Sequence, residues 1–372
     1  MPSAIDHIES LSPWPKAFGL GTMHALLAEL GQPQLAYPAV HVVGTNGKST
    51  TTRMVEALLA AEGLVVGAYL SPHVSGWSER IRVGAREAAF EPAIERVRPA
   101  AEALGATQFE TLTAAALTAF AEAEVGVAVV EAGLGGRLDA TNVLRSSVCV
   151  LTNVSLEHTE VLGRTREAIA AEKLAVVRPG STVVLGEAEW EALALARGAE
   201  RVVVEPGGNL AVARAAAEAF LGRPVDPAPA ASVRLPGRLE VRGERPLELW
   251  DGAHTPAGAD YLLEHLPERR FVVCVAFLGD KDVDGVLVRL ARVADRLVAT
   301  ASTSPRALPV QELAVRAENV FHSVDALQDP HAALALAREL AGRSGAVLVT
   351  GSLSLLADLA VRAKDVPSPA RG

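Results

Sequence analysis

The sequence predicts an α/β fold, in which a P-loop-type, doubly wound, mostly parallel sheet is followed by a second, smaller α/β domain. Short Val-rich runs alternate with longer segments of helical period, and near-continuous apolar strands separated by helices indicate a parallel sheet covered on both faces. One such strand leads into "GTNGKST" at 44–50, a turn typical of phosphate binding. The 372 residues, of which 49% are apolar, suffice for two cores.

The first domain is expected at 1–223, with strands at 39–43, 64–70, 125–131, 147–154 and 181–186. After the first strand, Met54, Val55, Leu58 and Leu59 fall on one helical face, and Gly63 is a plausible end of that helix. The glycine-rich turn therefore stands between a buried strand and a helix.

The segment "LGRPVDPAPAAS" interrupts the helical period with prolines, which predicts an interdomain linker at 224–232. Beyond it, the second domain is expected at 233–372. Its buried strands are predicted at 247–251, 269–280, 295–303 and 345–352.

Composition excludes several classes of protein. A formal net charge of -9 argues against a general affinity for nucleic acid, which would need a basic face. Cys149 and Cys274 both lie in apolar runs, so neither a disulfide framework nor a cysteine metal site is indicated. The first residues, "MPSAIDHIES", do not resemble a signal peptide, and no run of 18 apolar residues occurs. We expect a cytoplasmic protein without a membrane partner.

The glycine-rich turn is the first candidate site. Only two residues separate its glycines, whereas the common phosphate loop has four. In such a loop, backbone N–H groups and the start of the following helix face the phosphates. Lys48 would reach the β and γ phosphates, and Ser49 or Thr50 could face a metal ion; a plain turn is the alternative. The expected ATP-binding residues are Gly44, Thr45, Asn46, Gly47, Lys48, Ser49 and Thr50.

Three further residues are candidates at the same edge of the sheet. Glu131 ends a buried strand, where it could hold Mg²⁺ or be an ordinary solvated acid. His158 follows the next strand and is either a metal ligand or a hydrogen-bonded structural residue. Lys173 lies on a helix whose apolar face holds Ile169, and an ordinary lysine there would extend its amine to water.

These segments together resemble the folylpolyglutamate synthase and dihydrofolate synthase family, within the larger Mur ligase superfamily. The resemblance spans residues 18 to about 355 and is carried by "GLGTMHALLAELGQPQ", "HVVGTNGKST", "YLSPHVSGWSERIRV", "FETLTAAALTAF", "EAGLGGRLDATN", "SLEHTEVLG", "EKLAVVRPG", "LPGRLE", "DGAHTP", "TSPRALP" and "VTGSLSL". The short loop is this superfamily's version of the phosphate loop.

The resemblance implies a role for each matching residue of the first domain. Lys48 would bind phosphate, and Ser71 and Glu131 would be ligands of one Mg²⁺. His158 and Lys173 would be ligands of a second Mg²⁺. Lys173 would be carbamylated, which turns a cation into an oxygen ligand.

In the second domain, Arg238, Asp251 and His254 match family residues that reach the nucleotide. The family also implies the reaction. A carboxylate attacks the γ phosphate of ATP, and the amine of L-glutamate then displaces phosphate from the acyl phosphate. Lys48, Arg238 and two Mg²⁺ ions would stabilise the negative charge, and His254 is a candidate to accept the proton of the amine.

The sequence departs from the family pattern at a few positions. Ser49 stands where the family usually has Gly, and Thr255 where it usually has Asn. Glu157 and Glu160 stand where aspartates are common. None of these changes removes a charged group that the resemblance assigns to catalysis.

We therefore expect a ligase that adds L-glutamate to a folate and that acts as a monomer. The sequence leaves open whether it is a folylpolyglutamate synthase, a dihydrofolate synthase that accepts dihydropteroate, or both. Two alternatives remain at this point. "GKST" also suits a cell-wall Mur ligase or another Mur-type amino-acid ligase, although "SPHV", "SERIRV" and "GGRLDATN" oppose it. A non-catalytic ATP-binding paralogue is the second alternative.

Overall fold

The computed structural model describes residues 3–15 and 18–361. Contacts divide the chain into two compact units. The first unit runs up to Pro72 and continues over Trp77–Val233, and the second unit comprises His73–Gly76 and the chain from Arg234 onward.

The first unit is built on an eight-stranded sheet in the order β4-β3-β2-β5-β1-β6-β7-β8. Neighbouring strands are parallel except in the β2–β3–β4 meander. The strands are β1 (Ala39–Val43), β2 (Val66–Tyr69), β3 (Ile81–Val83), β4 (Arg86–Glu87), β5 (Val127–Glu131), β6 (Ser146–Leu151), β7 (Thr182–Leu185) and β8 (Arg201–Val204).

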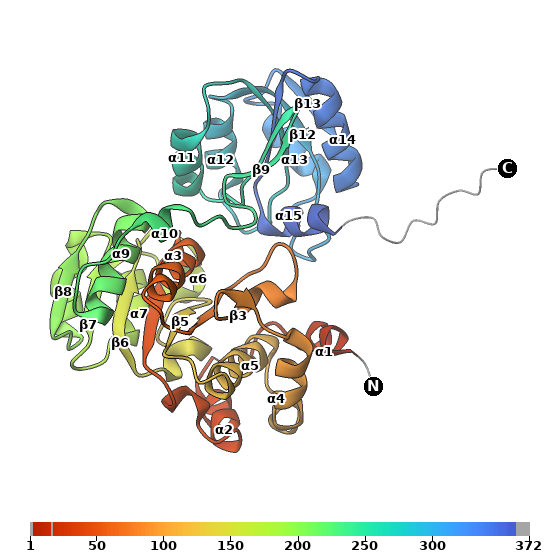
Figure 1. Ribbon diagram of the computed structural model, residues 1–372. Coiled ribbons are helices and arrows are strands. Elements are labelled where there is room, and N and C mark those ends of the chain that lie inside the picture. Colours follow the sequence, from red (N-terminus) through yellow and green to blue (C-terminus); the bar gives the residue numbers. More distant parts are fainter. Residues whose placement is uncertain (1–2, 16–17, 362–372) are drawn as a thin grey trace. The chain divides into compact units, whose positions relative to one another are not determined.

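Helices cover both faces of this sheet (Figure 1). Val40 and Val42 pack on the side of α3 and α9, whereas Ala39 and Val43 point to the opposite face. The helices are α1 (Ala4–Ser10), α2 (Gly21–Glu29), α3 (Lys48–Ala61), α4 (Phe90–Leu104), α5 (Gln108–Glu122), α6 (Thr159–Leu162), α7 (Arg166–Lys173), α8 (Glu191–Ala196), α9 (Gly208–Leu221) and α10 (Ala228–Ala231). Short 3-10 turns are η1 (Pro33–Leu35), η2 (Trp77–Arg80), η3 (Ala140–Val143), η4 (Leu174–Val176) and η5 (Ala188–Trp190).

The segment 224–232, interpreted from its prolines as a linker, is packed onto the first unit. It contains α10, which contacts α3 and α9. Val225 and Ala230 are buried in the same cluster as the apolar residues of those helices. The prolines separate α9 from α10, but the segment between and after them stays packed on the first unit because Val225 and Ala230 are buried in its core.

The second unit has a six-stranded sheet in the order β13-β12-β11-β14-β10-β9, parallel except for the edge strand β9. Its strands are β9 (Glu240–Glu244), β10 (Leu247–Trp250), β11 (Phe271–Val275), β12 (Ala294–Ala299), β13 (Ser323–Ala326) and β14 (Ala346–Thr350). One apolar cluster lies under α11 (Pro256–His265), α12 (Val283–Leu290) and α13 (Val310–Ala317). Another lies under α14 (Pro330–Ala341) and α15 (Leu353–Ala360).

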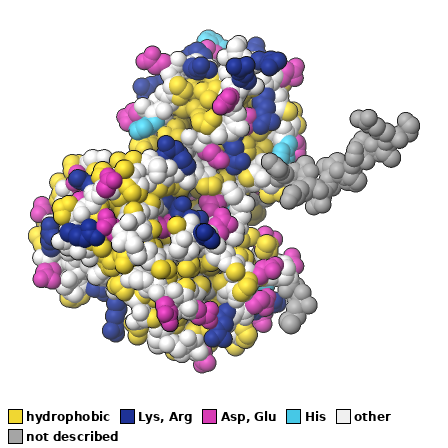
Figure 2. Space-filling view, viewed as in Figure 1, with side chains coloured by type: hydrophobic (Ala, Val, Ile, Leu, Met, Phe, Trp, Pro, Cys, Tyr) yellow, Lys and Arg dark blue, Asp and Glu magenta, His cyan; other side chains and the backbone are white. Residues whose placement is uncertain are grey.

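The predicted fold class is confirmed, and each predicted Val-rich run forms a strand. The strands that were not predicted are β3, β4, β8, β9 and β13. β3, β4, β9 and β13 are short and carry polar side chains, so their sequences lack a continuous apolar run. β8 is a four-residue edge strand whose apolar run is limited to Val202, Val203 and Val204. Among the described residues, no helix is long and apolar enough to cross a membrane. On the face shown in Figure 2, acidic and basic side chains are interspersed.

Candidate functional site

The glycine-rich turn joins β1 to α3, and two of its glycines are required by geometry. Gly44 has φ +152, and a Cβ there would lie 1.9 Å from Thr152 Oγ1. Gly47 has φ +80, and its Cβ would lie 2.3 Å from Asn209 Oδ1. Any other residue at either position would push against its neighbour and adopt a left-handed backbone at a cost. The loop therefore keeps its backbone close to the sheet edge.

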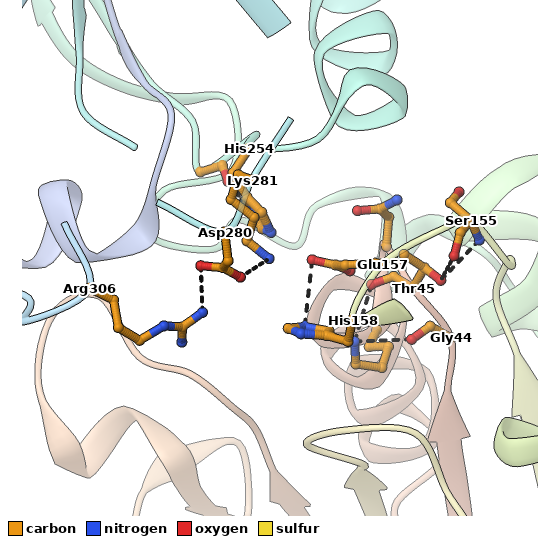
Figure 3. Close-up of polar contacts among 12 residues, drawn as sticks. Gly44, Thr45, Ser155, Glu157, His158, His254, Asp280, Lys281 and Arg306 are labelled. Carbon is orange, nitrogen blue, oxygen red and sulfur yellow. Dashed lines mark hydrogen bonds and ion pairs between the residues drawn. The ribbon is translucent and has the colours of Figure 1, made fainter. Parts of the chain in front are cut away.

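The segment after β6 holds this loop in place. Thr45 N donates to Asn153 O (2.9 Å), and Asn46 N donates to Asn153 Oδ1 (3.0 Å). Thr152 Oγ1 donates to Asn46 O (2.7 Å), and Ser155 N donates to Thr45 Oγ1 (3.0 Å; Figure 3). The three supporting residues Thr152, Asn153 and Ser155 were not predicted from the sequence. The available signal was their position directly after a buried parallel strand, where ligand sites of α/β folds gather.

Lys48 begins α3, and its side chain folds back over the loop. Its Nζ donates to Gly44 O (3.1 Å) and Thr45 O (3.2 Å). The first helical backbone bond runs from Thr51 N to Gly47 O, so the preceding N–H groups are those that a helix leaves without intrahelical acceptors. These donors and the ammonium group together form a positive end suited to phosphate oxygens.

Glu131 is the last residue of β5 and is 1% exposed. Ser49 Oγ donates to its Oε1 (2.9 Å), and Ser71 N donates to its Oε2 (3.1 Å). The structure thus brings together residues from α3, the end of β2 and the end of β5. The Glu131 carboxylate and the Ser49 hydroxyl are hard oxygen donors, which fits Mg²⁺. Within the described residues, no cluster of three or more His, Cys, Asp or Glu could hold a metal, so hydroxyls, water or phosphate oxygens would have to supply ligands.

Lys173 ends α7 and is 4% exposed, so the interpretation that its amine extends to water is wrong. Its Nζ donates to Gly44 O at 2.7 Å. The pKa of Lys173 is lowered from 10.5 to about 7, first by burial and then by the charge of Lys48, while Glu157 and Asp139 oppose the change. A lysine with such a pKa is partly neutral near pH 7, and a neutral amine is the form that can react with carbon dioxide.

His158 lies in the loop after β6, with a left-handed backbone (φ +51) at the start of α6. Its Nε2 is 3.7 Å from Glu157 Oε1 (Figure 3). Glu157 also acts electrostatically on Lys173, so one carboxylate faces both residues that were predicted to bind a second Mg²⁺. From the sequence, Glu157 is notable only as a departure from the family pattern.

In the second unit, Arg238, Asp251 and His254 lie at the end of β10. Asp251 accepts hydrogen bonds from Leu239 N (2.9 Å) and Ala253 N (2.8 Å). Burial raises the pKa of Asp251, although Arg238 opposes this change. A Cβ on Gly252 would lie 2.7 Å from an Arg238 guanidinium nitrogen, so the "DG" dipeptide leaves room for the arginine. His254 Nδ1 lies 2.8 Å from Gly252 O.

Thr255, where the family usually has Asn, caps α11. Its Oγ1 accepts a hydrogen bond from Gly258 N (3.1 Å). Thr and Asn both serve as helix N-caps, so this capping bond survives the departure.

A second charged cluster in this unit was missed as a site by sequence analysis. Asp280 pairs with Arg306 (2.7 Å) and lies 3.7 Å from Lys281 (Figure 3). Thr303 is held by Asp358 through its N–H and hydroxyl, both at 2.7 Å. These loops follow β11 and β12, and the signal for them was again their place after buried parallel strands.

Comparison with known proteins agrees with this geometry. Residues 42–201 match the Mur ligase middle domain, and residues 237–353 match the Mur ligase, glutamate ligase domain. The chain is 34% identical to the dihydrofolate synthase/folylpolyglutamate synthase of Mycobacterium tuberculosis, covering 83% of this chain and 80% of that protein. The chain belongs to the dihydrofolate synthase/folylpolyglutamate synthase family.

Other members of this family match over nearly their whole length. The Escherichia coli enzyme is 32% identical, over 95% of this chain and 93% of that protein. The structure of M. tuberculosis folylpolyglutamate synthase complexed with ADP superimposes with a TM-score of 0.88, at 32% identity and 96% coverage of both chains. The Yersinia pestis bifunctional enzyme with Mn, AMPPNP and L-glutamate bound gives 0.85, at 28% identity over 96% of this chain and 98% of that one.

Proposed function

We propose that this protein is an ATP-dependent carboxylate–amine ligase that adds L-glutamate to a folate, and that it also accepts dihydropteroate. It would thus act as both folylpolyglutamate synthase and dihydrofolate synthase. The proposal depends mainly on one observation. Lys48 and the glycine-rich loop lie beside Glu131 at one edge of the first sheet, so groups suited to phosphate and to Mg²⁺ are close together. Family membership along nearly the whole chain supports the same activity.

The reaction has two balanced steps. A carboxylate oxygen of the acceptor attacks the γ phosphorus of ATP, the bond from that phosphorus to the ADP oxygen breaks, and an acyl phosphate forms. The glutamate nitrogen then attacks the acyl carbon, inorganic phosphate leaves, and the nitrogen gives up a proton to a base. We propose that His254 is that base. In this case a His254→Gln variant should have an altered pH profile of turnover. If His254 only contacts ATP, the pH profile of the variant should equal that of the wild type.

The residues of the first unit divide into two sets. The N–H groups of residues 44–50 and the Lys48 ammonium would bind the nucleotide phosphates. Ser71 and Glu131 would hold one Mg²⁺, and His158 with carbamylated Lys173 a second. When bound, the metal supplies positive charge at phosphoryl oxygens.

The division of labour between the domains is also a proposal. We assign ATP binding mainly to the domain at 1–223 and glutamate ligation to the domain at 233–372. Within this second domain, we assign additional contacts with the nucleotide to Arg238, Asp251 and His254. The expected monomer remains a prediction that sedimentation of the purified chain would test.

One observation supports another Mur-type ligase as the second candidate. Ser49 is the residue by which "GKST" resembles the cell-wall enzymes more than the folate family. Its hydroxyl donates a hydrogen bond to Glu131, so this departure lies within the candidate site. The two candidates differ in their acceptors, so the substrate decides between them.

The experiment is mass spectrometry of the products formed with ATP, Mg²⁺ and glutamate. Dihydropteroate, tetrahydrofolate and a uridine-nucleotide acceptor are supplied separately, and the Lys48→Ala variant is the control. A product heavier by one glutamyl residue with either pterin acceptor supports the proposal. A product only with the uridine nucleotide supports the second candidate, and ATP binding without any product supports a non-catalytic paralogue.

A further inference from the structure

Glu187, two residues after the end of β7, bonds to the segment that supports the phosphate loop. Its Oε2 accepts hydrogen bonds from Val154 N (2.9 Å) and from Trp190 Nε1 (2.7 Å). Its Oε1 accepts a hydrogen bond from Arg166 (3.1 Å), and Arg166 Nε in turn donates to Val154 O (3.0 Å). Both backbone polar groups of Val154 are therefore held by Glu187 and Arg166.

The exposure of these residues shows which contact matters most. Val154 is 2% exposed and Trp190 is 4% exposed, so their N–H groups need an acceptor inside the protein. The ion pair is more accessible, since the side chains of Arg166 and Glu187 are 39% and 29% exposed, and such pairs contribute little by themselves. The carboxylate therefore acts mainly as the acceptor for Val154 and Trp190.

Val154 lies between the two residues that hold the phosphate loop. Asn153 accepts hydrogen bonds from Thr45 N with its backbone oxygen and from Asn46 N with its side-chain oxygen. Ser155 N donates to Thr45 Oγ1 (Figure 3). A shift of Val154 would therefore move the residues that order the loop proposed to bind the nucleotide phosphates.

The backbone before Glu187 lies close to the same segment. Gly186 N donates to Leu151 O (2.9 Å), and a Cβ on Gly186 would lie 2.0 Å from Thr152 O. The chain after β7 therefore lies directly beside the end of β6, an approach that glycine permits. This contact fixes the start of the Glu187 side chain relative to Val154.

We propose that Glu187 is a positioning residue for ATP: by accepting the Val154 N–H, it holds segment 153–155 where that segment orders the phosphate loop. This inference rests on the proposed function. A loop that is ordered before the nucleotide arrives loses less conformational freedom on binding. Glu187 thereby raises the affinity for nucleotide while it acts through Val154.

Hydrogen exchange in the nucleotide-free protein tests the contact without any turnover. Glu187→Ala removes the acceptor of the Val154 N–H, so the amides of Thr45 and Asn46, followed by NMR, should exchange about tenfold faster or more. Glu187→Gln keeps a carbonyl oxygen for Val154 and Trp190, and its loop amides should exchange within about threefold of the wild-type rate. If Glu187→Ala does not fold, Glu187→Met, which fills more of the space, replaces it.

Nucleotide affinity is the second measurement. Glu187→Ala should raise the Kd for ADP in calorimetry and the KM for ATP in turnover about tenfold, while the KM for glutamate changes less than about twofold. Glu187→Gln should recover most of the affinity for ADP.

Glu189→Ala is the matched control, because Glu189 pairs with the same Arg166 from a position that is 46% exposed. Among the described residues, Glu189 makes no bond to Val154. Its removal takes away one carboxylate from the same turn, and loop exchange and ADP affinity should stay near those of the wild type.

The proposal is overturned if either the loop exchange or the Kd for ADP of Glu187→Ala lies within about twofold of that of Glu189→Ala. A residue that only stabilises the fold would lower the free energy of unfolding and leave the affinity for ADP unchanged. Failure of the wild-type protein to ligate any pterin acceptor would instead count against the proposed function, because hydrogen exchange and ADP binding are measured without turnover.

Discussion

The Nζ atom of Lys173 lies 2.7 Å from the carbonyl oxygen of Gly44, a residue 129 positions earlier in the chain. The Lys48 amine bonds to the same oxygen at 3.1 Å. Two ammonium groups on one carbonyl repel each other, and the buried one is the one that gives up its proton more readily. This arrangement determines how the site responds to pH.

The first prediction concerns stability and pH. The pKa of Lys173 is about 7 in the folded protein against an ordinary 10.5, so between these values the unfolded chain binds more protons than the folded one. The unfolding free energy should therefore rise with pH across this window, by at most about 1.4 kcal/mol per pH unit, and the cost of the buried charge should be fully present below pH 7. Urea denaturation in CO₂-free buffer, compared with Lys173→Met, measures this. Parallel curves for the two proteins between pH 7 and 10 would contradict it.

The second prediction is that Lys173 forms a carbamate. Near pH 8 its amine is largely neutral and can attack CO₂, and the carbamate would give the site an oxygen ligand. Protein incubated with ¹³C-bicarbonate, Mg²⁺ and ATP should show a ¹³C carbamate signal that Lys173→Ala lacks. Short carboxylic acids should partly restore the activity of Lys173→Ala, and a crystal grown near pH 8 with Mg²⁺ and ATP that shows an unmodified Lys173 amine would refute the claim.

The third prediction concerns Lys48. Lys48→Ala should abolish ligation and leave the fold intact, because within residues 3–15 and 18–361 the Lys48 amine donates hydrogen bonds only to the loop carbonyls of Gly44 and Thr45. Turnover and circular dichroism measured on the same samples test both parts. A loss of turnover smaller than tenfold, about 1.4 kcal/mol of barrier, would count against Lys48 as the phosphate lysine.

The fourth prediction concerns Ser49. Ser49→Ala removes the hydrogen bond to Glu131 Oε1, so the Mg²⁺ concentration needed for half-maximal activity should rise about tenfold. The matched control is Thr51→Val in the same helix, since the Thr51 hydroxyl is buried without a hydrogen-bond partner among the described residues. That control should keep the wild-type Mg²⁺ dependence. An identical Mg²⁺ titration for all three proteins would show that Ser49 does not orient Glu131.

The fifth prediction tests the segment 224–232. Ala230→Asp places a carboxylate in the core beneath α10 and should lower the unfolding free energy by about 2 kcal/mol or more. Ala228→Asp, at an exposed position of the same helix, should leave stability nearly unchanged. Equal stability of the two variants in thermal unfolding would restore the interpretation of this segment as a free linker.

The phosphate loop was predictable because its signal is local. A buried strand, two glycines and a lysine before an amphipathic helix all lie within 39–61, and the structure forms β1, the loop and α3 there. The support from Asn153 and the approach of Lys173 were not predictable from spacing, since both depend on how distant parallel strands order themselves in the sheet.

The second unit gives an intermediate case. Arg238 and Asp251 are thirteen residues apart, and the family resemblance alone paired them. The structure supplies the reason, because the antiparallel pairing of β9 with β10 sets Glu240 opposite Trp250. Leu239 then falls within reach of Asp251, a register that the polar sequence of β9 does not reveal.

The four residues His73–Gly76 belong to the second unit although the chain on both sides of them belongs to the first. Val74 is buried in the same apolar cluster as Trp250 and Leu356, and its Cγ2 would lie 3.2 Å from a Cβ on Gly237. Neither unit is thus one uninterrupted stretch of polypeptide. A gene fragment that starts at Arg234 would encode a second unit that lacks His73–Gly76 and therefore the buried Val74 side chain. If the gene is split at that point, we expect the two halves to be soluble only when they are produced together.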